Sequence, residues 1–186
     1  SLATDMILAE KIAVDAAEPL GIPVFPVVPY GLASSFATFP GTLSLSLSTY
    51  IGVIRDLLDS MYRSGFRRIL VVNGHGGNVP TLKRAVALLR HEGRPVAWTG
   101  CGVPGGDAHA GRTETSMLRH LAPWSVQPGL AEPGVTTPAS ELMAELVAKG
   151  VRAVSPNGVL GDPTGSSAQE GRDVVETLVR RVVGEL

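Results

Sequence analysis

The segment that most constrains the fold joins an apolar run, a glycine loop and an amphipathic run. The apolar run covers residues 68–72, the loop reads Asn-Gly-His-Gly-Gly-Asn over residues 73–78, and the amphipathic run covers residues 79–91. A short run rich in valine predicts a buried strand. Apolar residues at helical spacing, closed by Gly93, predict a helix that ends there. A strand, a glycine turn and a helix in this order indicate an α/β fold.

The rest of the chain repeats this alternation. Apolar spacing predicts helices over residues 6–18, 48–64, 113–121, 140–149 and 169–186, and strands over residues 24–28 and 96–99. Asp5 and Ser140 are predicted to cap the helices that follow them, and Pro26 removes one hydrogen-bond donor from its strand. Strands that alternate with helices predict a mostly parallel sheet covered on both faces. We therefore expect a three-layer α/β/α sandwich that spans residues 1–186 as a single domain.

Composition excludes several classes of partner. The formal net charge is -1 and the 16 lysine and arginine residues form no cluster, which argues against a nucleic-acid partner. The single cysteine, Cys101, excludes an intrachain disulfide and a cysteine-rich zinc site, and it fits a reducing compartment. No apolar run approaches the ~20 residues of a membrane span, and residues 1–10 lack the pattern of a signal peptide. A cytoplasmic protein without membrane partners is expected.

The position of two histidines indicates where a site would lie. In parallel sheets, active sites lie beyond the carboxyl ends of the strands. His75 follows the strand at residues 68–72, and His109 follows the strand at residues 96–99 after a glycine-rich loop. We therefore expect both at one edge of the sheet. His91 and His120 fall on predicted helices and are interpreted as surface or packed residues.

The glycines around His75 favour a functional role. They allow a sharp turn and a close approach to a ligand, so a histidine offered there suits a metal ion or proton transfer. The alternative is a glycine turn with an incidental histidine. Phosphate binding by the loop is disfavoured, because Val79 stands where the last glycine of Gly-x-Gly-x-x-Gly is required.

A second group of candidate residues lies at the start of the helix predicted from residue 113. His109 and Glu114 can supply an acid–base group and a metal ligand. The structural alternative is that Asp107 or Thr113 caps the helix and that Glu114 faces its dipole. Capping accounts for Thr113 but leaves the histidine unexplained.

Taken together, four segments resemble the creatininase family of amidohydrolases. They are Thr-Asp at residues 4–5, Phe-Pro-Gly-Thr-Leu-Ser-Leu at residues 39–45, the loop at residues 73–78, and His-Ala-Gly-Arg-Thr-Glu-Thr-Ser at residues 109–116. They occur in the family's order and span most of the chain. Residues 105–116 and 155–163 look most like the mycofactocin branch of this family, whose enzyme is a peptidase that trims a precursor peptide.

The resemblance implies a three-layer fold and one or two divalent ions per subunit, zinc, iron or manganese. Asp5 matches the family's bridging aspartate, and His75 and Glu114 match further metal ligands. His109 matches a candidate catalytic acid–base group. Arg112 and Asn78 are predicted to contact the substrate, a peptide or a small amide. The ions would polarise the scissile carbonyl and activate water. The family also commonly forms hexamers, so a homo-oligomer is expected.

Three departures from the family pattern qualify these expectations. The family has a strand before Thr4-Asp5 that ends in a Glu-x-His-Gly-Pro-His motif, and this sequence begins after it, so we expect weak or absent metal binding by these residues alone. Ser35 and Phe36 stand where relatives often carry Glu-His. Gly77 stands where creatininase has a glutamate, which argues against creatinine as the substrate. Two alternatives follow: an amidohydrolase acting on another small cyclic amide or formamide, and a catalytically incomplete member with a structural role.

Overall fold

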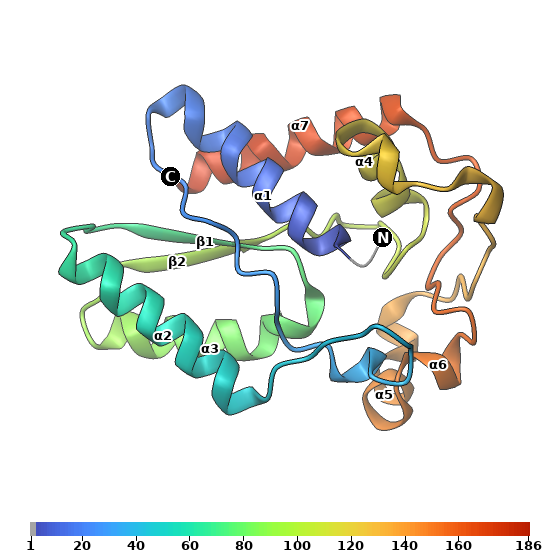
Figure 1. The fold of residues 1–186 in the computed structure, drawn as a ribbon, viewed down its shortest axis with the longest axis horizontal. Coiled ribbons are helices and arrows are strands. Elements are labelled where there is room, and N and C mark those ends of the chain that lie inside the picture. Colours follow the sequence, from blue (N-terminus) through green and yellow to red (C-terminus); the bar gives the residue numbers. More distant parts are fainter. Residues whose placement is uncertain (1–2) are drawn as a thin grey trace.

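The computed structural model describes residues 3–186 and has three layers (Figure 1). The central layer is a parallel pair of strands, β1 (Ile69–Asn73) and β2 (Val96–Gly100), in register from Ile69 opposite Val96 to Asn73 opposite Gly100. Helices α1, α4 and α7 lie on one face of this pair, and α2 and α3 lie on the other (Figure 1). The predicted α/β/α arrangement is therefore confirmed.

The helices agree closely with the sequence prediction. Their bounds are α1 Thr4–Ala17, α2 Leu47–Arg63, α3 Val79–His91, α4 Arg112–Leu121, α5 Ala139–Lys149, α6 Val151–Val154 and α7 Ala168–Glu185. Short 3₁₀ turns occur at Glu18–Leu20, Ser34–Phe36, Gly76–Asn78, Pro123–Ser125 and Pro128–Leu130. Only the four-residue α6 and these turns had no counterpart in the sequence prediction. The structure contains no helix, among the residues it describes, that is long and apolar enough to cross a membrane.

The side chains of β1 divide between two apolar cores. Leu70 and Val72 pack against a cluster built from α1, α4 and α7, whose buried members include Ile12, Met117 and Leu178. Ile69 and Val71 pack against a cluster from α2 and α3, which includes Leu58 and Leu82. Since successive strand residues point to opposite faces, a continuous apolar run is what a strand covered on both sides requires.

A third, smaller core holds the loops near the carboxyl ends of the strands. Leu146, Val151 and Leu160 form it, and Phe36 and Phe39 pack against it. In Figure 1, α5 and α6 lie beside the segment that leads into α2. This core therefore fixes the loop containing Phe36 close to the loop after β2.

The predicted strand over residues 24–28 is wrong. The structure has no strand there, and Val24, Phe25 and Val28 are exposed. Prolines at positions 23, 26 and 29 remove three backbone donors from the segment, so a regular ladder cannot form along it. Apolar composition suggested a buried strand, but these prolines account for the observed extended coil.

Two predicted helix caps are also wrong. Asp5 lies inside the first turn of α1, whose N-cap is Ala3, and Ser140 lies inside α5, whose N-cap is Pro138. Both helices begin earlier than predicted. An acidic residue in the first turn still interacts favourably with the helix dipole. Because Asp5 does not cap α1, its carboxylate is available for a contact outside the helix.

Candidate active site

Asp5 and His75 meet at the carboxyl end of β1. The Oδ2 atom of Asp5 lies 2.8 Å from Nδ1 of His75. The approach depends on Gly74, where an added Cβ would lie 2.2 Å from the backbone oxygen of Asp5. The glycine loop can therefore pass directly beside α1, which brings a residue of the first helix to the end of the strand.

The other ring nitrogen of His75 is also engaged. Its Nε2 lies 3.0 Å from the carbonyl oxygen of Leu32. The hydrogen bond with Asp5 is the main cause that raises the pKa of His75 above its usual value, against the opposing effect of burial. Both contacts orient the ring. An added Cβ at Gly77 would lie 2.3 Å from this Leu32 oxygen and 2.6 Å from Nε2, so residue 77 has no room for a side chain in this arrangement.

His109 and Glu114 form a second pair after β2. Nδ1 of His109 lies 3.8 Å from Oε2 of Glu114, and the same oxygen accepts a hydrogen bond from the backbone N–H of Ala110. Ala110 has φ of 53°, in the left-handed region that residues other than glycine seldom adopt. Leu160 fixes the segment from the other side through an antiparallel bridge to His109. The strained backbone thus positions both side chains.

The surroundings of this pair change its proton affinity. Burial raises the pKa of Glu114 to about 7, and burial lowers the pKa of His109 below its usual value. The ring of Phe36 covers His109, with 4.5 Å between ring centroids, and lies 6.4 Å from the ring of His75. Both histidines therefore flank one aromatic ring, which confirms that they occupy the same edge of the sheet.

The two pairs also interact electrostatically. The charge of Asp5 contributes to raising the pKa of Glu114, and the charge of Glu114 contributes to raising that of His75. Two carboxylates and two imidazoles therefore share one partly buried region. Side chains of these types are ones that ligate cations in proteins, and such a grouping can transfer protons near neutral pH.

Asn78 and Arg112 point away from these pairs into structural contacts. Oδ1 of Asn78 accepts from the backbone N–H of Leu32 at 2.8 Å, and its Nδ2 donates to Asn73 at 3.0 Å. Nε of Arg112 lies 2.9 Å from a carboxylate oxygen of Glu170 on α7. Asn78 is buried and Arg112 is half exposed. Substrate contact by either residue stays a prediction.

Asp107 has the capping role that the sequence left open. Its Oδ2 accepts a hydrogen bond from the backbone N–H of Thr113 at 3.1 Å, which satisfies one of the free donors at the start of α4. An added Cβ at Gly111 or Gly161 would lie within 2.6 Å of the Asp107 side chain. The side chain of Asp107 therefore lies close to the backbone at Gly111 and Gly161, and its carboxylate caps α4.

The side chains gathered here, carboxylates and imidazoles, are of the chemical types that bind divalent metal ions. Carboxylate and imidazole ligands suit zinc, manganese and iron, and a cation would offset the cost of burying Glu114 near Asp5. Within residues 3–186, however, no group of three or more His, Cys, Asp or Glu side chains is placed to hold an ion. The assignment of Asp5, His75 and Glu114 as metal ligands therefore stays a prediction, and further ligands would be needed to complete a coordination shell.

Sequence reasoning missed two participants at this edge. Phe36 was noted as a departure from relatives, but its packing on His109 was not anticipated. Its position just before Phe-Pro-Gly is the one signal that could have drawn attention to it. The carbonyl of Leu32 contacts His75, and a backbone oxygen leaves no mark in a sequence.

Two relatives from mycobacteria share one description. The chain is 43% identical over 187 residues to a mycofactocin precursor peptide peptidase from Mycolicibacterium smegmatis, covering 96% of this chain and 74% of that protein. It is 43% identical over 164 residues to the protein of that description from Mycobacterium ulcerans, covering 87% and 64% respectively. The chain thus spans about two thirds to three quarters of these relatives.

Solved structures agree with these sequence matches. A putative creatinine amidohydrolase from Bacteroides fragilis has a TM-score of 0.83 at 28% identity, covering 97% of this chain and 79% of that one. A manganese form of creatininase has a TM-score of 0.79 at 26% identity, covering 98% and 82%. A zinc–zinc form of a creatininase variant has 0.78 at 25%, covering 98% and 81%.

The family model for creatininase, described as creatinine amidohydrolase, matches residues 1–186. The match covers all four sequence segments that resemble the family, and the solved creatininases share the fold. The chain is therefore a member of the creatininase family of amidohydrolases, enzymes that act on C–N bonds.

Proposed function

We propose that the protein is a metal-dependent peptidase that hydrolyses a peptide bond in a precursor peptide of the mycofactocin type. The relatives at 43% identity carry that description. The observation that carries the chemistry is the partly buried His109–Glu114 pair beside the Asp5–His75 contact. It combines a group for proton transfer with side chains suited to a divalent ion.

Asp5, His75 and Glu114 are the residues that would hold the ion. A bound zinc, manganese or iron ion would polarise the scissile carbonyl and lower the pKa of water. Asp5 orients the His75 ring through Nδ1, and the carbonyl of Leu32 contacts the opposite nitrogen. For Nε2 to bind an ion, the loop that contains Leu32 must move away from it, because a nitrogen that ligates a metal cannot also donate a proton.

His109 is proposed to move the proton. Hydrolysis takes one proton from the attacking water and gives one to the departing amine. Burial under Phe36 keeps His109 neutral at pH 7, since it lowers the pKa of the ring. A neutral imidazole can accept the proton of water and then donate it to the amine nitrogen. Its neighbour Glu114 can stabilise the imidazolium formed between these events.

Substrate contacts by Arg112 and Asn78 differ in what they require. Arg112 holds Glu170 through Nε, so its terminal nitrogens would bind a carboxylate of the peptide, whereas the buried Asn78 would bind substrate only if it released Leu32 or Asn73. We retain both as proposals. The site otherwise presents the Phe36 ring, which offers an apolar contact to a side chain of the substrate.

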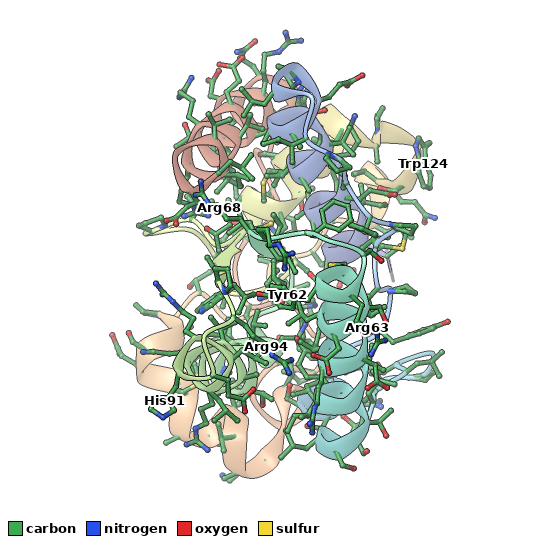
Figure 2. The ribbon with its side chains drawn as sticks, turned by 90° about the vertical axis from the view of Figure 1, so that its left-hand side faces the viewer. Tyr62, Arg63, Arg68, His91, Arg94 and Trp124 are labelled. Carbon is green, nitrogen blue, oxygen red and sulfur yellow. The ribbon has the colours of Figure 1, made fainter. Side chains whose placement is uncertain are left out.

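A peptide-hydrolysis assay tests the proposal. The purified protein is supplied with zinc, manganese or iron(II) and incubated with a synthetic precursor peptide, and products are identified by mass spectrometry. His109→Ala should lower the rate about 100-fold or more, as expected when an acid–base group is lost. His91→Ala is the matched control, since His91 is exposed at the end of α3 (Figure 2). Equal rates for both variants would remove His109 from the mechanism.

The same assay separates the two alternatives. Turnover of creatinine or a formamide without turnover of peptide would indicate a small-amide hydrolase. Gly77 disfavours creatinine, because it stands where creatininase has a glutamate. Metal retention without turnover of any substrate would indicate a structural family member.

The oligomeric state and the cellular location of the protein are also part of the proposal. We expect a cytoplasmic protein. We also expect a homo-oligomer, because large apolar side chains such as Phe25, Tyr30 and Ile51 are exposed and would be covered by contact with another subunit. Light scattering on the eluting protein measures the subunit number.

A further inference from the structure

A polar groove lies at the opposite edge of the sheet from the candidate active site. It has a volume of about 500 Å³, and Asp59, Tyr62, Arg63, Arg67 and Arg94 line it. These residues come from the end of α2 and from the turns that precede β1 and β2. They therefore lie at the amino ends of the strands, whereas His75 and His109 follow the carboxyl ends. Figure 2 looks onto this end and shows Tyr62 near Arg63 and Arg94.

The groove carries positive charge that the protein does not neutralise. Arg94 pairs with Asp59 and also contacts the carboxylate of Glu92, which lies outside the lining, at 3.8 Å, so Arg94 adds no free positive charge. Arg63 donates to the neutral hydroxyl of Ser60 at 3.0 Å. Arg67 has no ion pair or hydrogen bond within the part of the chain that the structure describes. The guanidinium groups of Arg63 and Arg67 therefore face the groove without a carboxylate partner among the described residues.

Tyr62 adds a buried donor to the groove. Its hydroxyl oxygen is inaccessible to solvent and has no hydrogen-bond partner among the described residues. A buried hydroxyl without a partner costs free energy. Arg94 lies close enough to act on the Tyr62 hydroxyl electrostatically, since its charge lowers the pKa that burial raises. A small shift of the ring would let an anion in the groove accept this hydrogen bond.

We propose that this groove binds a phosphate dianion, either inorganic phosphate or the phosphate of a small monoester. The two unpaired guanidinium groups match a charge of about −2. Each presents a planar fork of N–H donors that suits phosphate oxygens, and the Tyr62 hydroxyl supplies one more donor. A carboxylate has a single charge and two oxygens, so it satisfies fewer of these donors.

The size of the groove sets the range of ligands. Sites for small molecules occupy about 300–1,000 Å³, and the groove lies within that range. Inorganic phosphate would fill only part of it. The organic portion of a monoester such as a mononucleotide would occupy the remainder. Inorganic phosphate and a monoester present the same dianion to the arginines, so the experiment compares the affinities of the two ligands.

Titration calorimetry on metal-free protein tests the proposal, because removing metal prevents phosphate from binding at the other edge. The probes are inorganic phosphate, adenosine monophosphate and acetate, in chloride buffer. Arg63→Gln and Arg67→Gln each remove one unpaired charge. Arg68→Gln is the matched control: Arg68 is the exposed neighbour of Arg67, and Figure 2 shows it apart from Tyr62 and Arg94. Tyr62→Phe removes only the hydroxyl.

Each arginine variant should weaken phosphate binding about tenfold or more, as the loss of a charge-assisted hydrogen bond implies. Arg68→Gln should bind as the unchanged protein does, and acetate should give no saturable heat. Tighter binding of the monoester identifies the ester as the ligand; equal binding shows that the groove recognises the phosphate group alone, and weaker binding of the monoester identifies inorganic phosphate. Unchanged affinity in both folded arginine variants, or no phosphate binding at millimolar concentration, would overturn the proposal. Should the arginine variants fail to fold, unchanged affinity in Tyr62→Phe would overturn it instead.

Discussion

The carboxylate of Asp5 and the imidazole of His75 form a 2.8 Å contact that joins the first helix to the glycine loop after β1. The contact exists because Gly74 lets the loop approach the backbone of α1. It places two potential metal ligands together although they are far apart in the sequence. His109 and Glu114 lie nearby after β2, and the Phe36 ring is close to both His109 and His75.

Replacing His75 by alanine should lower metal content without unfolding the protein. The ring belongs to a loop at the strand end, and the apolar cores do not include it. Metal content is measured by mass spectrometry after incubation with zinc and desalting, and circular dichroism checks the fold. His91→Ala serves as the control. Unchanged metal content in His75→Ala would exclude His75 as a ligand.

A matched glycine pair tests the close packing around His75. In Gly77→Ala the new Cβ would clash with the Leu32 oxygen and with Nε2 of His75, whereas in Gly76→Ala the Cβ meets nothing within 4 Å. Overpacking of this kind costs about 1–3 kcal/mol. Urea denaturation should therefore show a loss of that size for Gly77→Ala and little change for Gly76→Ala. Equal effects of the two substitutions would contradict the close approach of residue 77 to Leu32 and His75.

Glu114→Gln should change stability in a pH-dependent way. In the metal-free protein, burial raises the pKa of Glu114 from 4.5 to about 7. The folded state therefore keeps a proton that the unfolded state loses, so stability falls as pH rises from about 4.5 to about 7. The loss amounts to roughly 3 kcal/mol.

Glutamine removes this titration and still accepts the hydrogen bond of Ala110. We therefore expect Glu114→Gln to raise the free energy of unfolding at pH 8, by up to roughly 3 kcal/mol, and to have a much smaller effect at pH 5. Urea denaturation at both pH values measures the difference. A change of equal size at pH 5 and pH 8 would show that the Glu114 carboxyl does not titrate with a raised pKa.

Arg112 and Glu170 provide a test of structural against substrate roles. Their ion pair joins α4 to α7 at a half-exposed position, so losing it should cost at most about 1 kcal/mol. A purely structural role predicts a similar small destabilisation in Arg112→Ala and Glu170→Ala, with KM unchanged in both. A substrate role predicts a raised KM in Arg112→Ala alone. Thermal denaturation and steady-state kinetics distinguish these outcomes.

The sequence predicted the helices and the two strands because their side-chain periodicity is local. Residues 79–91, for example, carry the helical spacing, the early proline and the terminal glycine that define α3. The error over residues 24–28 arose because valine content was weighed above the prolines around it. The predictions that Asp5 and Ser140 cap their helices were wrong because either residue type is equally acceptable inside the first turn of a helix.

The candidate site was predictable only in part. Glycines around His75 and the His109–Glu114 spacing pointed to the correct edge of the sheet. The contact of Asp5 with His75 depends on how α1 packs, and the resemblance to the family supplied it. The Phe36 ring on His109, the left-handed backbone at Ala110 and the Leu32 carbonyl are tertiary features. Local sequence patterns do not encode such contacts.

Peptide hydrolysis in the presence and absence of metal shows whether the protein is a metal-dependent peptidase. The protein is incubated with the precursor peptide, with a divalent ion or with excess chelator, and the masses of the products are measured. We predict two fragments whose masses sum to that of the peptide plus one water, and loss of cleavage on chelation and in Glu114→Ala. Cleavage that persists in chelator, or that Glu114→Ala leaves unchanged, would contradict it.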